Sequence, residues 1–229
     1  MSGQTCVDLS RLPRFVDISC VQAFHGQADI EQLAERAREG DFVSAHVLPS
    51  WISFARGLLE GSRTLVGGPA GFPSGGSLPD VKLREVQRLL DAGAQEIDVV
   101  VNIGRLRSGL YDDVTRELEP IVLLVGGEVP LRAILEVGYL DDEQVVEGAR
   151  AAVKAGMRWI KSGTGWSGRP TTSHHIALMA EGALGKAELK AAGGIRSLET
   201  VEAMIDLGVT RFGMNADAAM DLAAQASAR

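Results

Sequence analysis

Short apolar runs rich in Val, Ile and Leu alternate along the chain with longer segments in which apolar residues recur at helical spacing. The apolar runs predict eight strands, at residues 15–21, 42–48, 64–70, 96–102, 130–137, 157–162, 187–192 and 210–214. The segments between them predict helices at residues 28–39, 50–60, 80–92, 110–125, 141–155, 172–182, 197–207 and 216–227. Eight strand–helix units without a long linker predict a single α/β domain over residues 1–229, a parallel TIM (β/α)8 barrel.

Glycines mark four of the predicted joints between a helix and the strand that follows it. These glycines suit a left-handed C-cap, and they are Gly40, Gly93, Gly156 and Gly208. The residues five positions further on are, in the same order, Ala45, Asp98, Lys161 and Gly213. A barrel interior is filled by layers of side chains from alternate strands. If the four joints are equivalent, these residues share one layer, in which two small residues leave space between an acid and an amine.

The composition favours a soluble protein over a nucleic-acid-binding or membrane protein. The chain has 229 residues, 45% of them hydrophobic, and its formal net charge is −7. No run reaches the roughly 18 apolar residues of a membrane span, and the start of the chain lacks a basic segment followed by an apolar one. Cys6 and Cys20 form no disulfide framework. We therefore expect a cytoplasmic protein that binds a small molecule, with neither nucleic acid nor membrane as a partner.

Two lysines and an aspartate interrupt or end the predicted strands. Asp98 lies inside the apolar run 96–102, Lys161 ends the run that begins at residue 157, and Lys190 ends a run before a pair of glycines. Charges in such positions are unfavourable unless they are paired or used. A lysine becomes nucleophilic when a second cation or desolvation favours its neutral amine. Each lysine alone is better explained by a side chain that extends to solvent, but together the three residues predict amine catalysis on a carbonyl.

The loops that follow the last two predicted strands are candidates for binding an anion. Barrels often bind phosphate there, through free backbone N–H groups and a helix N-terminus. The candidate residues are Gly193, Gly194, Arg196, Gly213 and Asn215. For Arg196 the alternative is an ordinary surface charge at the start of a helix.

Two further features allow two interpretations each. His46 ends a buried run, and it is either a core histidine with satisfied hydrogen bonds or a residue of the site. The glycine-rich segment 67–76 is either a rigid turn or part of the active-site face. The adjacent histidines His174 and His175 point to different sides of a helix, so they do not predict a metal site.

These segments together resemble the deoxyribose-phosphate aldolase family, class I aldolases that fold as TIM barrels. The resemblance covers residues 64–213 and rests on four segments of the chain: Gly71-Phe72-Pro73, Glu96-Ile97-Asp98 through Asn102-Ile103-Gly104, Lys161-Ser162-Gly163-Thr164-Gly165, and Lys190-Ala191-Ala192-Gly193-Gly194-Ile195-Arg196. It implies a reversible aldol reaction of 2-deoxy-D-ribose 5-phosphate, or of a related aldehyde, with acetaldehyde as donor.

The resemblance also implies a role for each candidate residue. Lys161 would form the Schiff base, Asp98 would transfer protons, and Lys190 would perturb Lys161 and help to relay protons. No metal and no organic cofactor are expected, since the iminium is the electron sink. The residues that we expect to contact substrate are Thr164, Gly165, Gly193, Gly194, Arg196, Gly213, Asn215 and His46.

The sequence departs from the family pattern around the lysines. The nucleophile segment reads Lys-Ser-Gly-Thr-Gly instead of Lys-Thr-Ser-Thr-Gly, and His46 stands where cysteine is common. Asp17 is followed by Ile-Ser instead of His-Thr, and Met214 and Asn215 replace a hydroxyl-bearing pair. Two alternatives therefore stay open: a lysine-dependent aldolase with an unphosphorylated acceptor, or a noncatalytic barrel that binds a sugar phosphate. Whether the chain forms a homodimer is also left open.

Overall fold

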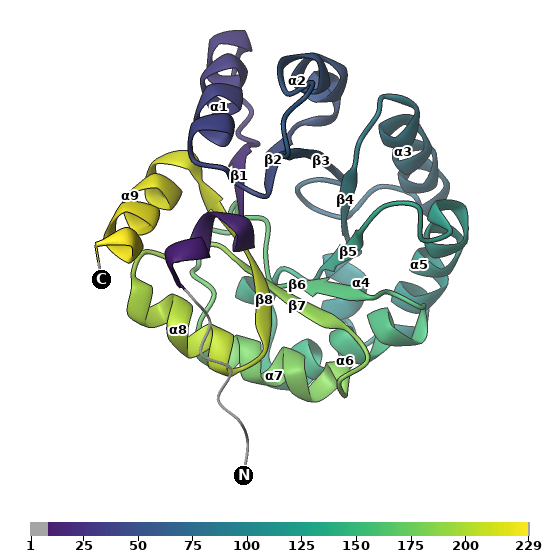
Figure 1. Ribbon diagram of the computed structural model, residues 1–229. Helices are drawn as coiled ribbons and strands as arrows, with labels where there is room; N and C mark the ends of the chain where they lie inside the picture. The colour runs from purple at the N-terminus through teal and green to yellow at the C-terminus, as the bar shows by residue number, and fades with distance from the viewer. Residues whose placement is uncertain (1–8, 229) are drawn as a thin grey trace.

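The computed structural model describes residues 9–228, which form a closed barrel of parallel strands in chain order (Figure 1). The strands are β1 (Val16–Cys20), β2 (Ser44–Val47), β3 (Leu65–Ala70), β4 (Glu96–Val100), β5 (Leu131–Ile134), β6 (Trp159–Lys161), β7 (Glu188–Ala192) and β8 (Val209–Asn215). The barrel closes where β8 pairs with β1, so that Asp17 lies opposite Gly213. The predicted TIM barrel and all eight of its strands are confirmed. Cys6 lies outside the described residues.

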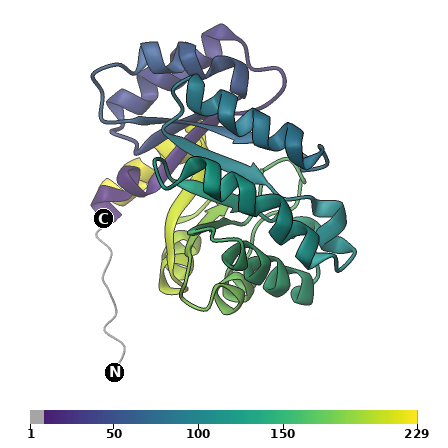
Figure 2. The ribbon, with the colours of Figure 1, turned by 90° about the vertical axis from the view of Figure 1, so that its right-hand side faces the viewer.

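The helices lie on the outside of this barrel (Figures 1 and 2). They are α1 (Gln27–Glu39), α2 (Ile52–Leu58), α3 (Pro79–Asp91), α4 (Ile103–Arg107), α5 (Tyr111–Val125), α6 (Asp142–Lys154), α7 (Ser173–Ala183), α8 (Leu198–Asp206) and α9 (Ala216–Ser227). The short helix α4 and the 3₁₀ turns η1 (Leu9–Phe15), η2 (Pro49–Trp51) and η3 (Val137–Tyr139) were not predicted. None of the helices in residues 9–228 is long and apolar enough to cross a bilayer.

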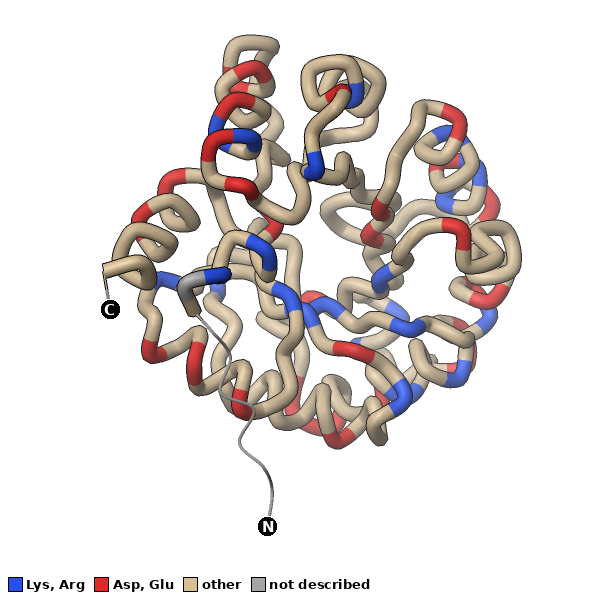
Figure 3. The backbone as a smooth tube through the Cα atoms, viewed as in Figure 1, with Lys and Arg blue, Asp and Glu red and all other residues tan. Residues whose placement is uncertain are grey.

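The alternation of side chains along β4 separates a charged interior from an apolar outer layer. Ile97 and Val99 belong to the hydrophobic core between the sheet and the helices. Glu96 and Asp98, on the other face, are buried inside the barrel and form ion pairs. Figure 3 shows the consequence, since charged residues lie along strands in the middle of the barrel as well as on the outer helices.

The prediction that Ala45 faces the interior is wrong, because the first joint is one residue longer than the others. Gly93, Gly156 and Gly208 adopt the left-handed conformation, with φ of 90°, 91° and 95°. Gly40 instead has φ −84°, and the left-handed residue is Asp41, with φ 48°. Counting five residues from Asp41 gives His46, whose side chain faces the interior charges, while Ala45 packs in the apolar outer layer.

Candidate active site

A cavity opens at the carboxyl ends of the strands, where TIM barrels place their active sites. Its floor is lined by Asp17, His46, Asp98, Lys161 and Lys190, which come from five different strands. The loops after β6 and β7, the end of β8 and the start of α9 line its walls. All of the residues that the sequence proposed for the site line this one cavity: Lys161, Asp98, Lys190, Thr164, Gly165, Gly193, Gly194, Arg196, Gly213, Asn215 and His46.

The two lysines meet at one oxygen of Asp98. Strands β6 and β7 pair so that Lys161 lies opposite Lys190, which brings both side chains to the same level of the barrel. Lys161 Nζ lies 2.7 Å from Asp98 Oδ2, and Lys190 Nζ lies 3.0 Å from the same atom. The side chain of Lys161 is 12% exposed and that of Lys190 is 1% exposed. A substrate in the cavity therefore has access to the amine of Lys161.

Burial and charge act in opposite directions on the protonation of this centre. Burial lowers the pKa of Lys190, against the opposing carboxylates of Asp17 and Asp98. Burial alone would raise the pKa of Asp98, but the neighbouring Lys161 and Lys190 hold it well below its ordinary range. Asp98 is therefore ionised.

Asp17 extends the ion-pair network to β1 and β8. Its Oδ2 lies 2.5 Å from Lys190 Nζ, and its Oδ1 accepts a hydrogen bond from Arg211 Nη1 at 2.7 Å. Ser44 Oγ donates to the same Oδ1 at 2.7 Å. The buried amine of Lys190 is thus fixed between two carboxylates, and its place beside Lys161 does not depend on Asp98 alone.

A second charged group lies directly beneath, around Glu96. Its Oε1 accepts hydrogen bonds from Arg132 Nη2 at 2.8 Å and from Arg211 Nη2 at 2.9 Å. Arg132 Nη1 also donates to Asp98 Oδ1 at 3.3 Å. Burial opposes ionisation of Glu96, but Arg132, His46 and Arg211 hold its pKa well below the ordinary range. The carboxylate that binds the lysines is therefore itself fixed by an arginine from the neighbouring strand.

The network residues Asp17, Glu96, Arg132 and Arg211 were missed as site residues in the sequence. The signal that points to them is strand alternation: Glu96 precedes Asp98 by two positions and therefore shares its face. Strand register then identifies Arg132, which lies opposite Asp98, and Arg211, which lies opposite Lys190. The last two could not be found without knowing the register.

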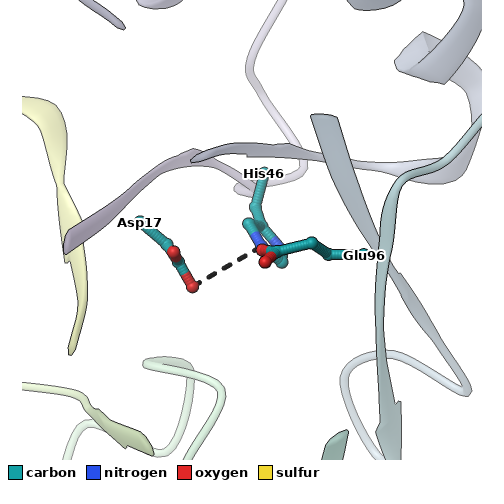
Figure 4. Close-up of side chains that lie close together, drawn as sticks. All are labelled: Asp17, His46 and Glu96. Atoms are coloured by element: carbon teal, nitrogen blue, oxygen red, sulfur yellow. Dashed lines mark hydrogen bonds and ion pairs between the residues drawn. The ribbon is translucent and has the colours of Figure 1, made fainter. Parts of the chain in front are cut away.

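Asp17, His46 and Glu96 offer three ligand atoms within 4.8 Å of one another, a spacing that a metal ion could use (Figure 4). The carboxylates are already paired, however, with Lys190 and Arg211 on Asp17 and with two arginines on Glu96. A divalent cation would stand among these positive charges, which would repel it. We therefore interpret the three residues as part of the ion-pair network.

Glu136 fixes the loop that follows Lys161, and no pattern in the sequence points to this residue. It is a buried residue in the left-handed region, with φ 59°. Its Oε2 accepts hydrogen bonds from the backbone N–H of Thr164, at 3.1 Å, and from the Thr164 hydroxyl. A side chain at Gly163 would lie only 2.9 Å from Glu136 Oε1, so glycine permits this close approach. Thr164 and Gly165 are thereby held at the cavity wall.

The loop after β7 presents backbone amides to the cavity. Gly193 and Gly194 are left-handed, with φ of 101° and 77°, and within residues 9–228 the N–H of Gly194 makes no hydrogen bond. Arg196, which is exposed, lines the same cavity. Asn215 is the N-cap of α9, and its Oδ1 accepts a hydrogen bond from Ala218 N at 2.8 Å. Its side-chain oxygen is therefore already occupied.

The fold and this centre, with one accessible lysine beside a buried lysine and an ionised aspartate, define a TIM-barrel enzyme of the aldolase class. No family model matches the chain. It is 44% identical over 218 residues to the deoxyribose-phosphate aldolase of Sinorhizobium medicae, covering 95% of this chain and 88% of that protein. It is 43% identical over 208 residues to the deoxyribose-phosphate aldolase of Klebsiella pneumoniae, covering 90% and 83%. The chain belongs to the deoxyribose-phosphate aldolase family, whose enzymes are lyases.

Solved structures agree with this assignment. A putative deoxyribose-phosphate aldolase from Coccidioides immitis superimposes with a TM-score of 0.89 at 26% identity, over 95% of this chain and 86% of that one. A deoxyribose phosphate aldolase from Aeropyrum pernix, described as a unique tetramer, gives a TM-score of 0.84 at 26% identity, over 95% and 91%. The family resemblance found in the sequence is confirmed, and it extends beyond residues 64–213.

Proposed function

We propose that this protein catalyses the reversible aldol cleavage of 2-deoxy-D-ribose 5-phosphate, or of a closely related aldehyde. Acetaldehyde is a product of the cleavage and the donor in the reverse addition. The observation that carries the proposal is the contact of Lys161 and Lys190 with one oxygen of Asp98. Of the two lysine side chains, that of Lys161 is the more exposed to the cavity. Relatives at 43–44% identity that bear the name deoxyribose-phosphate aldolase support the choice of substrate.

Lys161 is the proposed nucleophile. Its neutral amine adds to the aldehyde carbon of the open-chain sugar, and loss of water gives an iminium. A base takes the proton of the hydroxyl on the third carbon, the bond between the second and third carbons breaks, and its electrons move into the iminium. A three-carbon aldehyde leaves, and an enamine stays on Lys161. Protonation of the second carbon and addition of water then release acetaldehyde and restore the amine.

Lys190 and Asp98 are the proposed supporting groups. Lys190 supplies a second amine beside the nucleophile, because both amines lie against the same oxygen of Asp98. Asp98, held ionised, accepts protons and returns them through water in the cavity. The loop that Glu136 fixes keeps the wall beside Lys161 in place while the substrate enters and leaves.

A direct test is an assay of acetaldehyde release from 2-deoxy-D-ribose 5-phosphate by the purified full-length chain. The proposal expects turnover by the wild type and none above background by Lys161→Met. Lys186→Met makes the same substitution at an exposed lysine and should retain wild-type turnover. A wild-type protein that binds the sugar phosphate without releasing acetaldehyde would instead support the noncatalytic barrel.

The phosphate end of the site has features that favour weak recognition. The amides of Gly193 and Gly194 are suited to an anion, but Asn215 uses its side-chain oxygen to cap α9, and no serine or threonine stands beside it. Loss of one or two charge-assisted hydrogen bonds, at about 1.5–3 kcal/mol each, lowers affinity tenfold or more. We expect kcat/KM for deoxyribose 5-phosphate to exceed that for deoxyribose only modestly. A kcat/KM for the phosphorylated sugar that is roughly several thousand times that for deoxyribose would contradict this expectation.

A further inference from the structure

His46 has one ring nitrogen bound to the network and one directed at the cavity. Its Nε2 lies 3.2 Å from Glu96 Oε2, and since Glu96 is ionised, Nε2 carries the hydrogen of this contact. Burial, and then the charge of Lys190, lowers the pKa of His46, so the ring is neutral and Nδ1 is a bare acceptor. Within residues 9–228, Nδ1 makes no hydrogen bond, although the residue is only 4% exposed.

The carboxylate of Asp98 does not satisfy His46 Nδ1. Asp98 Oδ2 lies 3.7 Å away, which is beyond hydrogen-bond distance, and it is itself an acceptor. Two acceptors at this separation favour a donor beside them, such as a hydroxyl group. The ring cannot move away easily, because it packs on Gly67, where a Cβ would lie 2.5 Å from Cε1 and Nε2. His46 therefore presents a fixed, unpartnered acceptor in the cavity floor.

This acceptor is within reach of a molecule bound to Lys161. Asp98 Oδ2 lies 2.7 Å from Lys161 Nζ and 3.7 Å from His46 Nδ1, so the two nitrogens are at most about 6.4 Å apart. In an iminium on Lys161, an extended N=C–C–O unit spans about 3.6 Å, and a hydrogen bond adds about 2.8 Å. A hydroxyl on the second carbon of the bound donor therefore spans the gap.

We propose that His46 Nδ1 accepts a hydrogen bond from a hydroxyl on the second carbon of the Lys161-bound donor, so that the protein also uses 2-hydroxyaldehydes as donors. This inference rests on the proposed function. The simplest such donor is glycolaldehyde, and with a three-carbon aldehyde phosphate as acceptor the product is an aldopentose 5-phosphate that keeps its 2-hydroxyl.

The reaction needs no further reactant. The amine of Lys161 condenses with glycolaldehyde and releases water, and the second carbon then loses a proton to give an enamine that bears the hydroxyl. This carbon forms the new bond to the acceptor carbonyl, whose oxygen takes up a proton. Water then cleaves the iminium, which releases the aldol product and the free lysine. The hydroxyl on the second carbon is retained throughout, and His46 orients it.

The test compares two donors in separate reactions with D-glyceraldehyde 3-phosphate as the fixed acceptor. The products of acetaldehyde and of glycolaldehyde are quantified by mass spectrometry, and kcat/KM for each donor is measured for the wild type, His46→Leu and His46→Asn. The readout is the ratio of the glycolaldehyde value to the acetaldehyde value, which cancels losses common to both. In His46→Asn, the amide oxygen can take the place of Nδ1.

The wild type should form the aldopentose product, His46→Leu should lower the ratio about tenfold, and His46→Asn should restore most of it. A wild type that uses acetaldehyde but not glycolaldehyde overturns the inference, even if neither variant folds. An equal loss with both donors also overturns it, since it would mean that His46 holds water or the fold and does not select the donor. A wild type inactive with both donors, and also in the cleavage assay, would reject the proposed function itself.

Discussion

Asp98 accepts hydrogen bonds from Lys161 and Lys190 on a single oxygen, and its other oxygen is bound by Arg132. Two positive charges at one acceptor repel each other, so a charge on Lys190 acts directly on the amine of Lys161. Burial fixes Lys190 between Asp17 and Asp98, whereas Lys161 faces the cavity. At the scale of single residues, the different exposure of the two lysines explains why Lys161 is the proposed nucleophile and Lys190 the proposed supporting group.

We predict that Lys190→Met loses most turnover without unfolding. Asp17 keeps Arg211 and Asp98 keeps Arg132 and Lys161, so no carboxylate is left unpaired. Without Lys190, the centre loses the cation beside the nucleophile and a group that relays protons, and kcat should fall by about 10²–10⁴-fold. The measurements are steady-state kinetics and a urea unfolding curve. A folded variant with near-native turnover would exclude this role.

His46 predicts a pH dependence of stability. Burial lowers its pKa in the folded protein, whereas in the unfolded chain a histidine takes up a proton near pH 6.5. Below that pH the unfolded state binds a proton that the folded state does not. The free energy of unfolding therefore falls as pH decreases from about 7.5 to 5.5, by up to about 1.4 kcal/mol per pH unit for this group.

The variant His46→Asn should reduce this dependence, because it removes the titrating ring. Urea denaturation of the wild type and the variant across the same pH range gives the two slopes. The other histidines are common to both proteins, so the difference reports His46. Parallel slopes would show that the folded protein binds the His46 proton as readily as the unfolded chain does.

At the scale of elements, close packing of backbone against backbone holds the loop after β3 in place. The loop after β3 packs against the end of β4, where a Cβ at Gly75 would lie 1.8 Å from the carbonyl oxygen of Val101. Gly75 is also left-handed, with φ 66°, and its N–H donates to Gly71 O at 2.7 Å. Phe72 of this loop lines the cavity. Residues 67–70 of the glycine-rich segment belong to β3, and residues 71–76 form a tight turn that also contributes Phe72 to the cavity wall.

We predict that Gly75→Ala destabilises the protein by at least about 2 kcal/mol more than Gly61→Ala does. Gly61 is the matched control because it is also left-handed, with φ 73°, but a Cβ there would have no atom within 4 Å. The control should lose only about 1–2 kcal/mol, from the left-handed conformation. Urea unfolding curves give both values. Similar losses in the two variants would show that the loop moves freely away from Val101.

At the scale of the whole molecule, periodicity was sufficient to predict the barrel. Strands such as β4 are buried on both faces and therefore appear as apolar runs in the sequence. Short elements such as α4 were missed because five residues carry too little periodicity. The lysines and Asp98 could be found because a charge in an apolar run is conspicuous.

The rest of the site depends on backbone conformations and on contacts between strands, which cannot be predicted from the sequence pattern. His46 could not be assigned to the interior because Asp41, not Gly40, takes the left-handed conformation before β2. Arg14 stabilises this turn, since its Nη1 donates to the backbone and side-chain oxygens of Asp41, both at 3.2 Å. Glu136 follows β5 and contacts Thr164 after the neighbouring strand β6, a contact that depends on the pairing of these two strands.

The central claim is that Lys161 forms the covalent bond to the substrate. The most direct measurement is incubation of the full-length protein with acetaldehyde and borohydride, followed by mass spectrometry of its peptides. Reduction of the iminium leaves an ethyl group on the lysine that formed it. The account predicts this group on Lys161, which faces the cavity, and none on the buried Lys190. Labelling at Lys190, or no labelling at all, would contradict it.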